Sequence, residues 1–138
     1  MDTKFSVAVH VLILISESAV PMNSDRMAES VGTNASYVRK ILALLKKSDI
    51  INRVDSGYSL TYPPENLTLL EIYQAVMENS EIHLLDIHRN PNDKCIVGRH
   101  IKPVLTDIFT DIEKKFADSL ESKTLADCIK RIEKRIKE

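Results

Sequence analysis

A short helix, a glycine turn and a longer helix constrain what this chain can fold into more than any of its other features. The sequence predicts these three parts over residues 24–31, Gly32-Thr33-Asn34 and residues 35–47. Glycine accepts the left-handed backbone that ends a helix, and we expect Ser24 and Asn34 to be the N-caps of the two helices. The arrangement is typical of a helix-turn-helix.

The longer helix has two unlike faces. Its apolar side chains follow the spacing i, i+3, i+4, i+7 of a helix side packed on a core: Val38, Ile41, Leu42 and Leu45. The opposite face is small, polar and basic, as the major groove of DNA requires: Ser36, Lys40, Ala43 and Lys47, flanked by Tyr37 and Arg39. A solvated surface helix has a similar face, so this helix alone leaves both interpretations open.

The segment after this helix favours DNA. Residues 50–54 and 58–61 alternate like strands around a turn at Asp55-Ser56-Gly57, which predicts a short hairpin, or wing. Residues 24–53 hold six basic and three acidic side chains, a local charge of +3 within a chain of net charge −1. The cationic excess therefore lies where a phosphate-binding surface is needed.

The C-terminal half predicts more helices. Thr68 caps a helix over residues 69–77, and Thr124 caps another whose Leu125, Ile129, Ile132 and Ile136 repeat at heptad spacing. Between them we expect an irregular stretch and then a long helix from residue 101, with Pro103 tolerated only in its first turn. Its apolar stripe comprises Ile101, Val104, Leu105, Ile108, Phe109, Ile112, Phe116 and Leu120.

The predicted fold is mainly α, a winged helix-turn-helix with a small two-stranded wing and a long C-terminal dimerisation helix. Residues 1–78 form the DNA-binding domain, residues 79–100 an effector or linker segment, and residues 101–138 the dimerisation helices. The long stripe exceeds what the small domain needs, so we expect a two-fold homodimer. Packing of the stripe back on the first helix is the alternative. A two-fold dimer would read a pseudo-palindromic operator in double-stranded DNA.

The apolar N-terminal stretch predicts a core helix over residues 4–17. Its apolar run is shorter than the roughly 20 residues that span a bilayer, and no small-residue cleavage site follows it. We therefore expect a cytoplasmic protein without membrane association. His10 in this helix is expected to be half-buried and hydrogen-bonded.

The contacts expected with DNA come from three places. The long helix enters the groove with its N-terminal turns, the short helix touches the backbone at its start, and the wing touches it at the tip. The candidate residues are Ser24, Arg26, Asn34, Ser36, Tyr37, Arg39, Lys40, Lys47, Arg53 and Ser56.

Two cysteines and several histidines allow further interpretations. Cys95 follows Lys94 and precedes Arg99 and His100, and nearby positive charge favours a reactive thiolate, so Cys95 is a candidate redox sensor; an inert packed thiol is the alternative. Cys128 is expected to be buried. A metal-sensing regulator using Cys95 with His83, His88 and His100 is a weaker alternative, because the spacings match no common site.

The sequence favours a regulator over the other classes of protein. It contains no glycine-rich phosphate loop, nucleophile elbow or paired metal motif, so we expect no enzymatic activity. A winged helix that binds only other proteins is the alternative function. The basic side chains of the long helix favour DNA.

Several stretches of this chain follow a known family pattern: Phe5 to Ile15, Ala35-Ser36-Tyr37-Val38-Arg39-Lys40-Ile41-Leu42, Leu44-Leu45-Lys46, Gly57-Tyr58-Ser59-Leu60, Pro64-Glu65-Asn66-Leu67-Thr68-Leu69-Leu70-Glu71-Ile72 and Thr124-Leu125-Ala126-Asp127. Together they resemble the Rrf2 family of bacterial winged-helix regulators, which includes the iron–sulfur cluster regulator and the cysteine-metabolism repressor. The resemblance covers nearly the whole chain and implies a homodimeric repressor or activator with paired long helices and a signal-responsive segment between Met77 and Ile101.

Two departures from the family pattern stand out. The wing tip is reduced to Asp55-Ser56-Gly57, where the family commonly has a longer tip rich in arginine and glycine. Cluster-binding members supply three closely spaced cysteines in the effector segment, whereas this chain has Cys95 alone, and one thiolate cannot supply that ligation. The resemblance is therefore to the branch without a cluster, and we expect no cofactor.

Overall fold

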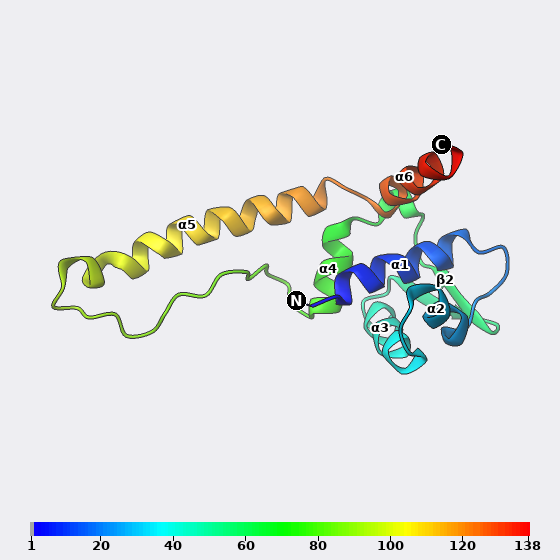
Figure 1. Ribbon diagram of the computed structural model, residues 1–138, viewed down its shortest axis with the longest axis horizontal. Helices are drawn as coiled ribbons and strands as arrows, with labels where there is room; N and C mark the ends of the chain where they lie inside the picture. The colour runs from blue at the N-terminus through cyan, green and yellow to red at the C-terminus, as the bar shows by residue number, and fades with distance from the viewer. Residues whose placement is uncertain (1) are drawn as a thin grey trace.

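The computed structural model describes residues 2–138 and is mainly helical, as predicted (Figure 1). A winged-helix body lies at one end, and one long helix projects from it. The elements of residues 2–138 are α1 (Lys4–Glu17), α2 (Ser24–Val31), α3 (Ala35–Lys47), β1 (Ile51–Val54), β2 (Gly57–Leu60), η1 (Pro64–Asn66), α4 (Leu69–Met77), α5 (Ile96–Glu121) and α6 (Leu125–Lys137).

Helix α1 is the centre of the core. It contacts α2, α3, α4, α6 and β2, which explains why its sequence is apolar on nearly every side. Val11 and Leu12 are completely buried, and the aliphatic stripe of α3 packs in the same cluster. Burying a large aliphatic side chain stabilises a fold by about 1.5–3 kcal/mol, so this contact sets how α3 is oriented.

The caps of the two central helices are only partly as predicted. Asn34 caps α3, since its Oδ1 accepts the Tyr37 backbone N–H at 2.8 Å. The prediction for α2 was wrong, because Asn23 is its cap and accepts the Arg26 backbone N–H at 3.0 Å, while Ser24 is the first helical residue. Both residue types cap helices well, so their order alone did not decide between them.

The wing is an antiparallel hairpin in which Val54 pairs with Gly57 and Ile51 with Leu60. The left-handed residue of its turn is Asp55, at φ 45°, and not the glycine. Gly57 has a different task, because a Cβ there would lie 2.6 Å from the Cβ of Pro21 and 2.9 Å from the backbone nitrogen of Met22. The absence of a side chain therefore lets the wing pack against the loop between α1 and α2.

Helix α6 returns to the body and joins its core. Leu125 is completely buried and Ile129 is 7% exposed, and this half of α6 contacts α1. The backbone of Leu125 donates to Leu67 and that of Leu69 to Lys123, both at 2.9 Å. As predicted, Thr68 and Thr124 cap α4 and α6, each in a full capping box.

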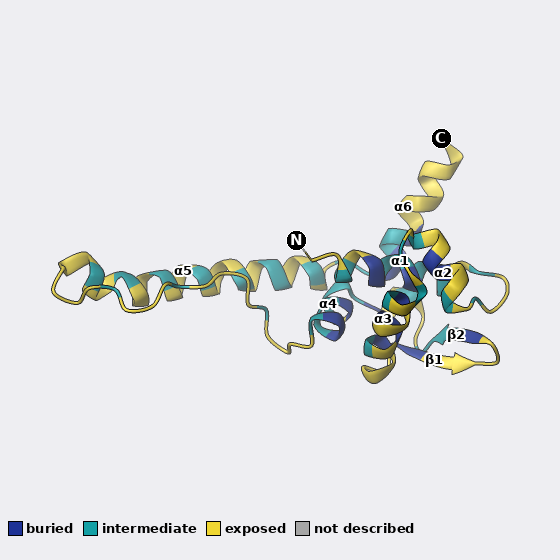
Figure 2. Ribbon diagram, turned by 60° about the horizontal axis from the view of Figure 1, so that its bottom comes forward, coloured by how far each residue is buried: buried dark blue, intermediate teal, exposed yellow. Residues whose placement is uncertain are grey.

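Helix α5 differs most from its prediction. It begins at Ile96 and not at residue 101, so Pro103 lies inside the helix and not in its first turn. None of its residues is buried, and Figure 2 shows it extending away from the body. Its C-terminal part is anchored by edge-to-face aromatic contacts, since Phe5 of α1 packs on Tyr73 of α4 and Tyr73 on Phe116, with ring centroids 5.4 and 5.5 Å apart.

No helix within residues 2–138 is both long enough and apolar enough to cross a membrane.

The substitution Gly57→Ala tests the close approach between the wing and the loop after α1. The new methyl group meets a proline ring and a backbone atom, which cannot move cheaply, so we expect a loss of about 1–3 kcal/mol in the free energy of unfolding. Urea denaturation at fixed protein concentration measures it. Ser56→Ala, in the exposed turn, is the control and should leave stability nearly unchanged; an equally stable Gly57→Ala protein would contradict the packing described.

Candidate nucleic-acid interface

Helix α3 turns its polar and basic face away from the body. The aliphatic stripe is buried, with Val38, Ile41 and Leu45 completely inaccessible and Leu42 at 2% exposure. The exposed residues of this helix are Ser36, Arg39, Lys40, Ala43, Lys46 and Lys47. The two faces predicted from the sequence are thus the two faces of the folded helix.

Helix α2 supports the start of this face. The Ser24 hydroxyl accepts a hydrogen bond of 3.4 Å from the Arg39 guanidinium, which connects the first residue of α2 to α3. Arg26, in the first turn of α2, is exposed. The structure therefore brings Ser24 and Arg39 together and leaves Arg26 open to solvent.

Two of the residues predicted to contact DNA, Asn34 and Tyr37, make contacts within the protein. The side-chain Oδ1 of Asn34 accepts the hydrogen bond that caps α3. Tyr37 is half-buried and lines a hollow with Thr3, His10 and Val31, so its ring leans back toward α1. Both residues help place the N-terminus of α3 relative to the body.

The wing presents a second cationic group. Arg53 donates to the Tyr58 hydroxyl at 3.2 Å, and its guanidinium lies 5.4 Å from the centre of that ring. This cross-strand pair fixes the arginine on the exposed side of β1. Ser56 lies exposed in the turn at the tip.

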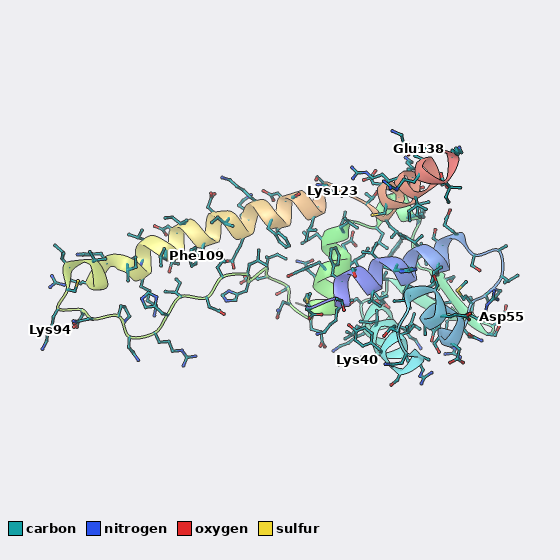
Figure 3. The ribbon with its side chains drawn as sticks, in the orientation of Figure 1. Lys40, Asp55, Lys94, Phe109, Lys123 and Glu138 are labelled. Carbon is teal, nitrogen blue, oxygen red and sulfur yellow. The ribbon has the colours of Figure 1, made fainter. Side chains whose placement is uncertain are left out.

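Helix α3 and the wing lie on the side of the body away from the end of α6 (Figure 2). Figure 3 shows Lys40 at one edge and Glu138, the end of α6, at the opposite edge, with Asp55 at the wing tip. The last turn of α3 lies next to the end of α4, because Lys47 Nζ is 3.9 Å from the Glu78 carboxylate. A helix face with basic residues around small ones such as Ser36 and Ala43 can contact the phosphates on both sides of a groove.

Cys95 is exposed and lies at the far end of α5, beside Lys94 (Figure 3). It is the N-cap residue of this helix without a side-chain capping hydrogen bond, and the nearby backbone N–H groups of Gly98 and Val97 lower the pKa of its thiol. Cys128 was predicted to be buried and is half-buried; burial raises the pKa of its thiol. Because the 26 residues of α5 span about 39 Å, these two cysteines of one chain cannot form a disulfide.

The histidines do not assemble with Cys95. His10 is half-buried and its Nε2 lies 3.0 Å from the Ser30 hydroxyl, as predicted. His83 contacts Asp86 at 2.7 Å. Within residues 2–138 no three His, Cys, Asp or Glu side chains are grouped closely enough to hold a metal ion. The weaker metal-sensing interpretation therefore has no site in the described part of a single chain.

Two residues with clear tasks were missed from the sequence. Asn23 carries the cap of α2, and an asparagine directly before a helix is the signal that could have found it. Glu113 of α5 accepts the backbone N–H groups of Leu84 and Leu85. A glutamate in an amphipathic helix gives no local signal of such a long-range contact.

A winged helix-turn-helix with an outward basic helix defines a class, the DNA-binding transcriptional regulators. Within that class the chain belongs to the Rrf2 family, whose model, described as an iron-dependent transcriptional regulator, matches residues 1–131. It is 37% identical to YwnA of Bacillus subtilis (strain 168), described as an HTH-type transcriptional regulator, over 96% of this chain and 98% of that protein. The family resemblance drawn from the sequence is thus confirmed.

Solved structures agree with this assignment. A crystal structure described as that of a DNA-binding protein is 34% identical and has a TM-score of 0.75, covering 91% of this chain and 98% of the other. CymR, the global cysteine regulator of B. subtilis, shares the fold with a TM-score of 0.70 at 17% identity, over 94% of each chain.

The iron named in the family description does not fit the residues of this chain. Cys95 is the one cysteine between α4 and α5, and Cys128 lies beyond the other end of α5. An iron–sulfur cluster needs several thiolate or imidazole ligands close together. The donor set here is therefore unlike that of a cluster-binding protein.

Proposed function

We propose that this protein is a sequence-specific DNA-binding repressor that binds a pseudo-palindromic operator as a homodimer. The observation that carries the proposal is the orientation of α3, whose aliphatic face is locked in the core while Ser36 and Lys40 face solvent. A helix held in this way enters the major groove without disturbing the core of the protein.

The contacts follow from this orientation. In the first turns of α3, Ser36, Arg39 and Lys40 reach base edges or phosphates, and Tyr37 and Asn34 support them at the rim of the groove. Helix α2 contributes Ser24 and Arg26 to the backbone on one side. The remaining phosphate contacts come from Lys47, Arg53 and Ser56.

A homodimer is supported by the apolar surface that α5 leaves uncovered. Val104, Ile108 and Ile112 follow each other at four-residue spacing and are 50%, 49% and 44% exposed. A projecting helix with such a stripe is unstable in water alone, and pairing with a second copy buries the same stripe on both chains. Two copies of α3 related by a two-fold axis would then read two half-sites.

We assign a separate role to each of three segments of the chain. Residues 1–78 bind DNA, residues 79–100 carry the response to a signal, and residues 101–138 hold the dimer together, except that the start of α6 also completes the core. Repression requires only that the bound dimer cover promoter DNA.

Regulation by thiol oxidation is a second element of the proposal, supported by the exposed Cys95 and its lowered pKa. A lower pKa increases the thiolate fraction at neutral pH, and the thiolate is the form that oxidants attack. A peroxide would oxidise this thiolate to the sulfenate while being reduced to water, placing a polar group at the N-terminus of α5.

Arg39→Ala and Lys40→Ala test the face that binds DNA. We expect each substitution to weaken binding to the DNA upstream of the protein's own gene by at least about fivefold. The slope of log affinity against log salt should also fall by about one for each phosphate that the variant no longer neutralises. A gel-shift titration over several salt concentrations measures both quantities.

The matched control for these variants is Lys134→Ala, which removes an exposed lysine of α6 on the opposite side of the body. All three variants should unfold at the temperature of the unmodified protein. Wild-type affinity in both α3 variants would show that the docking face is wrong. A protein-interaction module would bind no duplex at any salt concentration.

Ile108→Glu tests the dimer. A carboxylate in the middle of the paired stripe would be buried without a partner, so we expect the protein to change from dimer to monomer and to lose its operator affinity. Sedimentation equilibrium gives the mass. Lys114→Glu, which places the same carboxylate on another face of α5, should remain dimeric; a dimeric Ile108→Glu protein would rule out this interface.

Cys95→Ser tests the redox response. In the unmodified protein we expect hydrogen peroxide to change operator affinity and Cys95 to be alkylated faster than Cys128 at neutral pH, because the pKa of Cys95 is lowered and that of Cys128 is raised. Cys95→Ser should lose the peroxide response, whereas Cys128→Ser should keep it. The same peroxide response in Cys95→Ser would exclude Cys95 as the sensor.

A further inference from the structure

The segment between α4 and α5, which we call the strap (residues 79–95), has no helix or strand and runs outward from the body beside α5, which then returns (Figure 1). In the middle of α5, the side chain of Glu113 connects the two. The Glu113 carboxylate of α5 accepts hydrogen bonds from the backbone N–H groups of Leu84 and Leu85, the second at 3.2 Å. The His83 ring adds a charge contact, since its Nδ1 lies 3.8 Å from the same carboxylate oxygen.

Glu113 is unusually shielded for a residue of α5. Its side chain is 14% exposed, whereas the carboxylates of Asp111 and Asp118 on the same helix are 61% and 57% exposed. The strap covers it, and the two amide hydrogen bonds lower its pKa. A shielded carboxylate that accepts two amide protons is a strong point of attachment.

The strap is otherwise loosely packed on α5. Hollows of about 480 and 520 Å³ lie on the two sides of the Glu113 contact, and His83, Thr110 and Glu113 line both of them. No strap residue is buried, although Leu84 and Leu85 are apolar and remain 40% and 36% exposed. Along the middle of α5 the strap is thus held at the Glu113 contact between two hollows, and at its far end the Arg99 side chain of α5 donates to the Asp93 carbonyl at 3.0 Å.

The start of the strap lies next to the recognition helix α3. The strap follows Glu78, the left-handed residue that ends α4 and whose carboxylate lies near Lys47. Gln74 of α4 donates to the Ser80 carbonyl at 2.8 Å. A displacement of the strap therefore reaches the end of α3 through only a few residues.

We propose that Glu113 is a latch that holds the strap on α5, and that release of this latch lowers the affinity of the protein for its operator. Strap residues line one hollow together with Phe109, a member of the apolar stripe of α5 (Figure 3). The effect on operator affinity depends on the DNA-binding function proposed above. The attachment of the strap by Glu113 does not.

The latch has a definite dependence on pH. Glu113 contributes above its ordinary pKa and loses its contribution as the pH falls through its lowered pKa. His83 has a raised pKa, mainly through Asp86, so its contribution is complete below its ordinary pKa and is lost as the pH rises through the raised one. The latch is therefore tightest at mildly acidic pH. The charged groups that face His83 are Glu81, Asp86, Arg89, Glu113 and Lys114.

Amide hydrogen exchange tests the latch directly in the full chain. We expect Glu113→Ala to speed exchange at the Leu84 and Leu85 amides by about tenfold, because it removes two charge-assisted hydrogen bonds. Glu113→Gln keeps the shape but cannot titrate, so its protection should no longer fall at acid pH. Glu121→Gln, an exposed glutamate on the same helix, should exchange like wild type. Wild-type protection in Glu113→Ala would overturn the latch.

Operator binding tests the regulatory half with the same proteins. We expect Glu113→Ala to bind the upstream DNA at least about fivefold more weakly than Glu121→Gln, in the range of ordinary allosteric coupling. Faster exchange with unchanged affinity would overturn the regulatory role alone. Failure of the unmodified protein to bind any duplex would instead overturn the proposed function and leave the exchange result intact.

Discussion

The burial of one side of α3 is the constraint on which the rest of the structure depends. Four aliphatic residues of this helix are buried in the core cluster that also contains α1, and each contributes about 1.5–3 kcal/mol through burial. Since the helix cannot rotate without exposing them, its small and basic side must face solvent. This orientation explains why a helix-turn-helix, a flanking wing and a charge of +3 over residues 24–53 occur together. All three contribute to one surface for DNA only if the basic side of α3 faces solvent.

Features determined by nearby residues were predictable from the sequence. The bounds of α1, α3 and α4 followed from helical period, and the caps Asn34, Thr68 and Thr124 from hydrogen-bond chemistry a few residues away. Features that depend on contacts distant in sequence were not. The local pattern indicates that Gly57 serves the turn, whereas its actual constraint is the approach of Pro21, which is distant in the sequence. Glu113 gives no local signal because its hydrogen-bond partners lie 28 and 29 residues away.

The C-terminal half combines two unlike parts. The start of α6 is a piece of the body, tied to α4 by paired backbone hydrogen bonds and by Leu125 in the core. Helix α5 and the strap form an arm whose apolar surface remains uncovered in a single chain. A well-packed winged-helix body attached to a loosely packed arm is suited to regulation, because the weak contacts of the arm can change while the core of the body stays intact.

The central claim is that the outward face of α3 lies in the major groove of the operator. Photo-crosslinking tests it most directly, with a crosslinking side chain placed at position 40 in one protein and at position 134 of α6 in another. We expect operator DNA to be captured from position 40, at bases within the half-sites, and not from position 134. Capture from α6 alone would contradict the account, whatever the affinity of the complex.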